Sequence, residues 1–80
     1  MTLKKGDLIR FKRTGRMATV MCDEYTARFI DAQDEEMIAH GMGHMAGSYG
    51  SAVDICYMDT METRRKIKVS SAVIEVVSLT

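Results

Sequence analysis

Both histidines of the chain lie in one uncharged, glycine-rich stretch, "HGMGHMAGSYGSA" at residues 40–52. His40 and His44 are four residues apart, a spacing that puts two imidazoles on one face of a helix, where a third ligand would complete a zinc site. Gly41 and Gly43 lie between them, however, and each glycine costs a helix about 1 kcal/mol. Two interpretations stand, a metal site and a pair of solvated loop histidines. We expect the second, with no metal and no other cofactor.

The same stretch contains "GMGHMA", which matches one form of the dinucleotide-binding fingerprint. That motif requires a strand before it and a helix after it within a βαβ unit, whereas the segment before it is expected to be helical. A Ser/His/Asp set can also be drawn from His44, Ser48 and Asp54. Catalysis needs a preorganised pocket that excludes water, and a chain this short rarely encloses one. We therefore expect a non-catalytic protein.

Apolar side chains are unusually frequent for a loop in and beside this stretch: Met37, Ile38, Met42, Met45 and Tyr49. Methionine is flexible and polarizable, which suits adaptable contact surfaces. One interpretation is an interaction surface for a second copy or another protein. The other is a flap that folds back and caps an open end of the sheet.

The chain has no net charge, but its charges are sorted along the sequence. Residues 1–16 are mostly basic, residues 23–36 are mostly acidic, and "RRKIK" at 64–68 is basic again. A general polyanion binder would carry a strong basic excess. Nucleic-acid binding through the two basic clusters is nevertheless the alternative function. The contacts would come from Arg10, Lys12, Arg13, Arg16, Arg64, Lys66 and Lys68.

Alternating patterns predict a hairpin near the beginning of the chain. In "DLIRFK", Ile9 and Phe11 alternate with basic residues, as in a half-buried strand. "RMATVMC" predicts a second strand. One of its faces would carry Ala18, Val20 and Cys22, and the other Met17, Thr19 and Met21. "RTG" between them provides a tight turn.

The middle of the chain changes character twice. "YTARFID" predicts either a short third strand or a continuation of the second after a bend at residues 23–24. "AQDEEMIAH" predicts a short helix at residues 35–40, with Asp34 as its N-cap and Gly41 ending it.

The last third predicts a second hairpin, formed by "SAVDICYMD" and "RRKIKVS" around a loop at 59–63. A symmetric loop would place Val53 opposite Val69 and Ile55 opposite Ile67, with the oppositely charged pair Asp54 and Lys68 on the other face. "SSA" then predicts a single 3₁₀ turn, and "VIEVVS" a final strand.

"KKGDLIRFKRTGRMATVM" and "VDICYMDTMETRRKIKVSSAVIEVVS" resemble the beginning and end of small Src homology 3-like barrel proteins of phage and bacterial genomes. The resemblance implies an all-β, five-stranded barrel, with one domain over residues 1–80. A long insertion at about 24–51, between strands two and three, would carry the short helix. Members of this family mostly lack an assigned activity, so the resemblance implies a fold and a phage-like origin but no catalytic residue.

Eighty residues provide a single, marginal core, which assembly with further copies would stabilise. We therefore expect a self-associating interaction or accessory module. Cys22 and Cys56 are too few for a disulfide scaffold, and we expect both thiols to be free. The sequence has neither a signal-peptide pattern nor an apolar run of about 20 residues, so we expect a cytoplasmic protein that does not bind membranes.

Overall fold

The computed structural model describes residues 2–78 and shows a mostly β protein with one short α-helix. The six strands form a single antiparallel sheet, which confirms the all-β class. One strand more than expected is present because the segment at 24–51 contributes a strand of its own. The elements are β1 (Leu8–Phe11), β2 (Met17–Val20), β3 (Tyr25–Phe29), α1 (Ala32–Ala39), the 3₁₀-helix η1 (Gly43–Met45), β4 (Ser48–Tyr57), β5 (Thr63–Lys68) and β6 (Ile74–Ser78).

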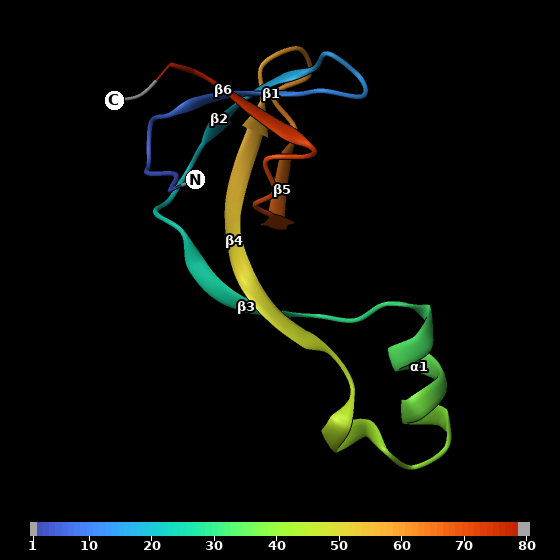
Figure 1. The fold of residues 1–80 in the computed structure, drawn as a ribbon. Helices are drawn as coiled ribbons and strands as arrows, with labels where there is room; N and C mark the ends of the chain where they lie inside the picture. The colour runs from blue at the N-terminus through green and yellow to red at the C-terminus, as the bar shows by residue number, and fades with distance from the viewer. Residues whose placement is uncertain (1, 79–80) are drawn as a thin grey trace.

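The long strand β4 organises the sheet (Figure 1). Along one edge it pairs with β3 near its beginning and with β2 near its end, so that β3 continues the path of β2 after a bend. β5 lies along the other edge of β4. β1 pairs with both β2 and β6, and the pair Ile9↔Ala18 confirms the first predicted hairpin. The final predicted strand is β6, which follows a turn closed by hydrogen bonds to the Ser70 carbonyl.

The hydrophobic core lies within the part of the sheet formed by β1, β2, β6 and the second half of β4. Its fully buried side chains come from alternating positions, as the strand patterns predict. They are Leu3, Ile9, Ala18, Val20, Val53, Ile55 and Ile74. Ile67 is half-buried and packs against this cluster, so the two isoleucines of the second hairpin face inward as expected.

The predicted register of the second hairpin is wrong. Val53 pairs with Ile67, and Ile55 pairs with Arg64. The turn is closed earlier than expected, by a hydrogen bond from the Tyr57 N–H to the Glu62 carbonyl. A bulge then places two β5 residues opposite Asp54, and one of them, Lys66, takes the left-handed conformation at φ 55°. A bulge of this kind adds one residue to one strand and shifts every later pair.

The molecule is elongated, with extents of 43 × 21 × 21 Å. Its radius of gyration is 14.4 Å, against roughly 12 Å for a compact domain of this length. The core-bearing part, residues 2–24 and 53–78, is called the body here. β3 and the first half of β4 form a two-stranded arm, and residues 30–47, called the tip, lie at its end with α1 (Figure 1).

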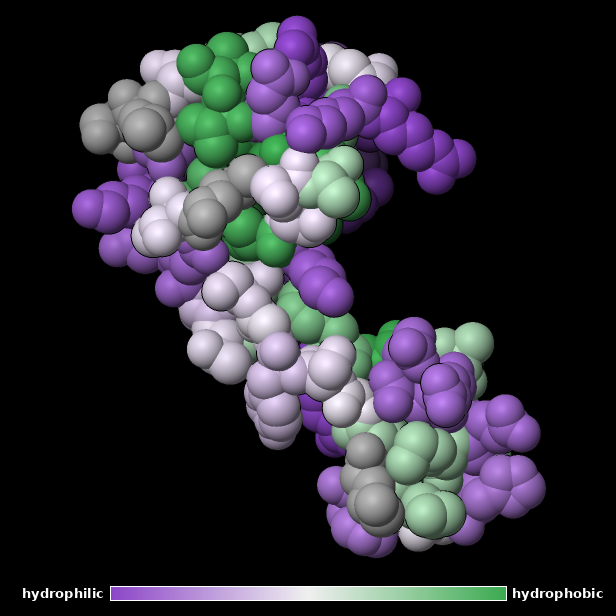
Figure 2. Space-filling view, viewed as in Figure 1, coloured by the Kyte–Doolittle hydropathy of each residue, from purple (hydrophilic) through white to green (hydrophobic). Residues whose placement is uncertain are grey.

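The segment at 24–51 is therefore neither a loop nor a flap that covers the sheet. Its two flanks pair with each other from Tyr25↔Ala52 to Phe29↔Ser48, and η1 is the main neighbour of α1. The outline of the molecule is concave beside the arm, between body and tip (Figure 2). The glycine-rich stretch was expected to lack regular structure, but β4 begins within it at Ser48.

Candidate functional site: the tip and the far end of the body

The tip begins with a helix whose start differs from the prediction. α1 begins at Ala32, and its N-cap is Asp31. The Asp34 N–H donates to the Asp31 carboxylate at 2.9 Å, and the Asp31 N–H donates to the Asp34 carboxylate at 3.1 Å. This reciprocal capping box satisfies two backbone donors that the first helical turn leaves without partners. The N-cap is three residues earlier than expected because Asp34 serves as the second half of the box.

The end of α1 follows the prediction. His40 is the C-cap, and Gly41 has φ 79°, a conformation that glycine adopts without steric cost. Gly43 begins η1 and lies beside Ile38, so that an added Cβ would be in ordinary contact with the Ile38 Cγ1 atom at 3.5 Å. The chain therefore reverses direction within a few residues after α1.

Arg28 connects the arm to the tip. Its guanidinium donates to the Ala46 carbonyl at 2.9 Å from Nε and to the Gly43 carbonyl at 2.8 Å from Nη2. Gly47 has φ 89°, and a Cβ on it would lie 2.6 Å from the Arg28 Nε atom. Position 47 thus requires glycine both for its backbone conformation and for the approach of Arg28.

The charge of the tip is strongly negative. It contains Asp31, Asp34, Glu35 and Glu36 and no lysine or arginine, so its formal charge is −4. The chain is neutral as a whole, so the rest of the molecule carries +4. The backbone of Gly47 and then the N–H of Asp31 donate to Asp34 and lower the pKa of that carboxyl. The Asp34 carboxyl is accordingly ionised at neutral pH.

The tip also exposes apolar side chains. α1 has no buried residue. Ile38 and Met42 are exposed by 47% and 43%, and Met37 is half-buried. Tyr49, in the arm, is exposed by 76%. Of the five predicted interaction residues, only the side chain of Met45 lies outside the described part of the chain.

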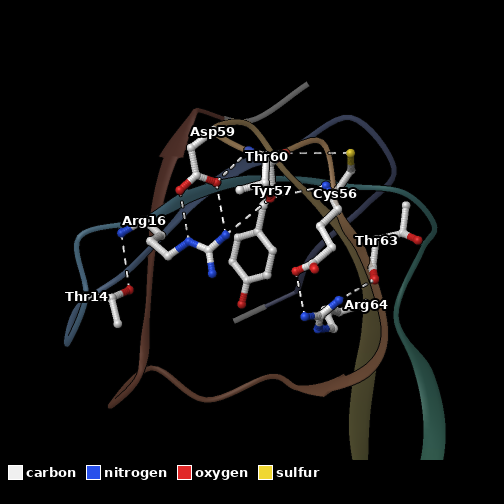
Figure 3. Close-up of polar contacts among 9 residues, drawn as sticks. Thr14, Arg16, Cys56, Tyr57, Asp59, Thr60, Thr63 and Arg64 are labelled. Atoms are coloured by element: carbon white, nitrogen blue, oxygen red, sulfur yellow. Dashed lines mark hydrogen bonds and ion pairs between the residues drawn. The ribbon is translucent and has the colours of Figure 1, made fainter.

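At the far end of the body, Arg16 contacts residues in and beside the β4–β5 turn (Figure 3). Its Nε and Nη2 atoms each donate to the Asp59 carboxylate at 3.0 Å. The guanidinium also lies 3.6 Å from the centroid of the Tyr57 ring. Arg16 lowers the pKa of Asp59 through the hydrogen bond and the charge interaction. Planar stacking combined with a two-point carboxylate contact is characteristic of arginine.

Next to Arg16 is an apolar depression of about 360 Å³, called the end hollow, which is lined by Thr19, Cys56, Tyr57, Met58 and Met61. Met58 is exposed by 53% and Met61 by 72%. On the other side of Tyr57, Arg64 forms an ion pair with Glu62 and remains half-exposed (Figure 3). The end hollow is thus an apolar surface, and the two arginines lie near it without lining it.

Tyr25, Asp54 and Lys66 tie the arm to the body. The Tyr25 hydroxyl donates to the Asp54 carboxylate at 2.6 Å, and the Lys66 N–H donates to the same oxygen at 3.1 Å. The hydrogen bond raises the pKa of Tyr25 and lowers that of Asp54. Both shifts move the pKa further from neutral pH, whereas general acids and bases work best when their pKa lies near the ambient pH. The contact therefore serves to hold three strands together.

The predicted nucleic-acid contacts near the N-terminus do not form a groove. Arg10 forms an ion pair with Glu75 at 2.5 Å. Lys12 donates to the Ser71 carbonyl at 2.7 Å, and Arg16 is held by Asp59. Arg13 is exposed in the turn before β2.

The second basic cluster lies on β5, which is not a neighbour of β1 in the sheet. The ammonium groups of Lys66 and Lys68 lie 5.6 and 5.5 Å from the centroid of the Phe29 ring in the arm. Lys66 also donates to the Arg28 carbonyl at 2.9 Å. The two basic clusters therefore form separate patches and no continuous groove.

The two predicted metal-ligand candidates, His40 and His44, are both exposed in the tip. Among residues 2–78, no three His, Cys, Asp or Glu side chains form a group that could hold a metal ion. Cys22 and Cys56 are free thiols, as expected.

Sequence reasoning missed the end hollow and the Arg28 contact. The hollow had a signal, because the outward face of the second predicted strand carries Met17, Thr19 and Met21 instead of charged residues, and the following hairpin turn also contains methionine. The Arg28 contact had no signal in the sequence, because it depends on a backbone turn that brings the Gly43 and Ala46 carbonyl groups together.

None of the helices in the described residues is long and apolar enough to span a membrane. Comparison with known proteins gives no significant match, whether to a family model, a curated protein or a solved structure.

Proposed function

We propose that this protein is a non-catalytic interaction module that associates with a second copy of itself, and that the tip of one copy docks on the body of the other. The observation that carries the proposal is the tip itself. It is a helix without a buried residue, held away from the body on a two-stranded arm.

Among the described residues, the helix of the tip has little to pack against. Isolated helices shorter than about 12 residues are marginal in water, and most helices in proteins are stabilised by packing of an apolar face. α1 has eight residues and packs mainly against the three-residue η1. Contact with a second molecule would bury Ile38 and Met42 and stabilise the helix.

The charges of the two ends are complementary. The tip carries −4 and the body +3, and Arg28 of the arm supplies the remaining positive charge. The molecule that separates the two ends is 43 Å long. Opposite patches of this kind steer two molecules into a head-to-tail approach and disfavour the contact of two like ends.

Sedimentation equilibrium at micromolar concentration tests association. We expect a species of twice the 9.0 kDa chain mass. Association should be weaker in 0.5 M salt, because salt ions then screen charge interactions beyond a few ångströms. A monomer under all conditions contradicts the proposal.

A matched pair of variants tests the role of the tip. Glu35→Gln with Glu36→Gln raises the net charge by two within the tip, and we expect the dissociation constant to rise by about tenfold, or roughly 1.4 kcal/mol. The control, Ser71→Lys with Ala72→Lys, also raises the net charge by two, but at exposed positions of the body. If the two variants behave alike, net charge and not the tip governs association.

The second candidate function is binding of single-stranded nucleic acid along β5. It is supported by the two lysine ammonium groups near the Phe29 ring, because aromatic rings next to cations are used for base stacking. A fluorescent oligonucleotide titrated at low and high salt tests it. Binding must weaken steeply with salt if phosphate contacts dominate.

We also propose that the body is a Src homology 3-like barrel. The strand order β5-β4-β2-β1-β6 and the turn immediately before the last strand support this fold. An experimental structure showing a flat, open sheet would exclude it.

A further inference from the structure

We propose that the end hollow is the surface that receives the tip of the second copy. This inference rests on the proposed self-association and specifies its receptor: Ile38 and Met42 would enter the hollow, and the acidic residues of α1 would face its arginines.

The apolar parts of the two surfaces are complementary. Met58 and Met61 expose 53% and 72% of their surface around a depression of about 360 Å³. This volume accommodates branched and linear aliphatic side chains such as Ile38 and Met42. Methionine-lined grooves adapt to amphipathic helices because the thioether side chain has several rotatable bonds.

The charged parts agree with the same arrangement. Glu35 and Ile38 are three residues apart on α1, so they lie on one face of the helix. A helix that places Ile38 in the hollow therefore brings Glu35 near two arginines. Arg16 stacks on the ring of Tyr57, which lines the hollow, and Arg64 follows Thr63, the sheet partner of the lining residue Cys56 (Figure 3). The arginine side chains remain 33% and 49% exposed beyond their internal ion pairs. A guanidinium has five N–H donors, so each arginine can donate to a further carboxylate.

The positions of the two surfaces require a second molecule. The β4–β5 turn, which forms part of the end hollow, lies at the opposite end of the molecule from α1 (Figure 1). A chain cannot place its tip in its own hollow across this distance. Two copies laid antiparallel about a two-fold axis satisfy both contacts at once, as closed dimers do.

Replacing the methionines of the hollow is the first test. In Met58→Ser with Met61→Asn, asparagine keeps the left-handed conformation that Met61 adopts at φ 59°. We expect dimerisation at least about tenfold weaker, as for loss of a central apolar contact. The control is Val73→Ser with Val77→Ser, two valines that are each 47% exposed elsewhere on the body, and it should leave dimerisation unchanged. Far-UV circular dichroism verifies folding of all variants.

A charge exchange is the second test and does not depend on the methionines. Arg64→Glu alone should weaken dimerisation, and adding Glu35→Arg should restore most of it by reversing both partners of the contact. Failure of this rescue, together with wild-type dimerisation of the methionine variant, overturns the hollow as receptor. Self-association through the tip then still stands if Glu35→Gln with Glu36→Gln weakens the dimer. If that variant has no effect, or if the wild type is a monomer, the proposed function itself is wrong.

Discussion

The body and the tip are stabilised in different ways. In the body, seven fully buried side chains from strands far apart in the sequence form one core. In the tip, Ala46 is the only described residue that is buried, and the fold depends on the capping box and on the Arg28 contacts to backbone carbonyls. The body is thus stabilised by burial of apolar surface, and the tip mainly by hydrogen bonds.

This difference predicts different unfolding behaviour. Regions with few buried apolar contacts open at low free energy, independently of global unfolding. The tip should therefore open locally while the body stays folded, which is the behaviour of a segment that becomes ordered when a partner covers it. The exposed Ile38 and Met42 are the side chains that would gain most from such a contact.

The largest effect is expected from a cavity in the core of the body. Ile55→Ala should lower the free energy of unfolding by about 2–5 kcal/mol, because a fully buried isoleucine loses both its burial and its packing. Ile38→Ala in the tip should cost below about 1 kcal/mol, since that side chain is 47% exposed. Urea unfolding of both variants, followed by circular dichroism, measures the difference. Equal losses would mean that body and tip unfold as one unit.

An intermediate effect is expected at the junction of arm and tip. Gly47→Ala forces a side chain into the left-handed region and against Arg28, so we expect a loss of about 1–3 kcal/mol. Gly41→Ala is the matched control, because its φ is also positive but no atom lies within 4 Å of the added Cβ. Amide hydrogen exchange should show loss of protection in the tip, larger for Gly47→Ala, and unchanged protection in the body. Loss of protection in the body, or equal effects of the two variants, would contradict the independence of the tip.

Sequence patterns were sufficient to predict the body. Ile9, Ala18 and Ile55 are at alternating positions whose inward face follows from the two-residue period of a strand. The pairing of β5 could not be predicted in the same way, because Lys66 adopts a positive φ that is uncommon for residues other than glycine, asparagine and aspartate. Such a bulge leaves no trace in a hydrophobic pattern, so the predicted register was off even though the inward-facing residues were right.

The tip was predicted less well, for a physical reason. The existence of its helix and the end at Gly41 followed from local residue preferences, but the N-cap was assigned to the wrong aspartate, because Asp31 and Asp34 are both suitable caps and occupy both positions of one box. In the arm, the predicted strand at 25–31 is confirmed by β3. The beginning of β4 was missed because it contains serine and glycine, which have low strand propensity. The pairing of Ser48–Ala52 with β3 depends on the preceding β4–β2 alignment, which is a long-range property.

The smallest effect is expected from acidification, at the contact that joins arm and body. The hydrogen bond from Tyr25 lowers the pKa of Asp54 below its ordinary value of 3.8. A carboxyl whose pKa is lower in the folded state stabilises the fold above its unfolded-state pKa, and this contribution is lost as the pH falls through the folded-state value. Tyr25→Phe removes the donor, so its deficit in unfolding free energy relative to wild type should be constant from pH 7 to about 4.5 and shrink below pH 4. Urea titrations at a series of pH values measure this deficit. A deficit that stays constant down to pH 3 would show that Tyr25 acts through packing on the arm and not through the Asp54 carboxylate, and the arm would then be joined to the body mainly by its backbone pairing with β4.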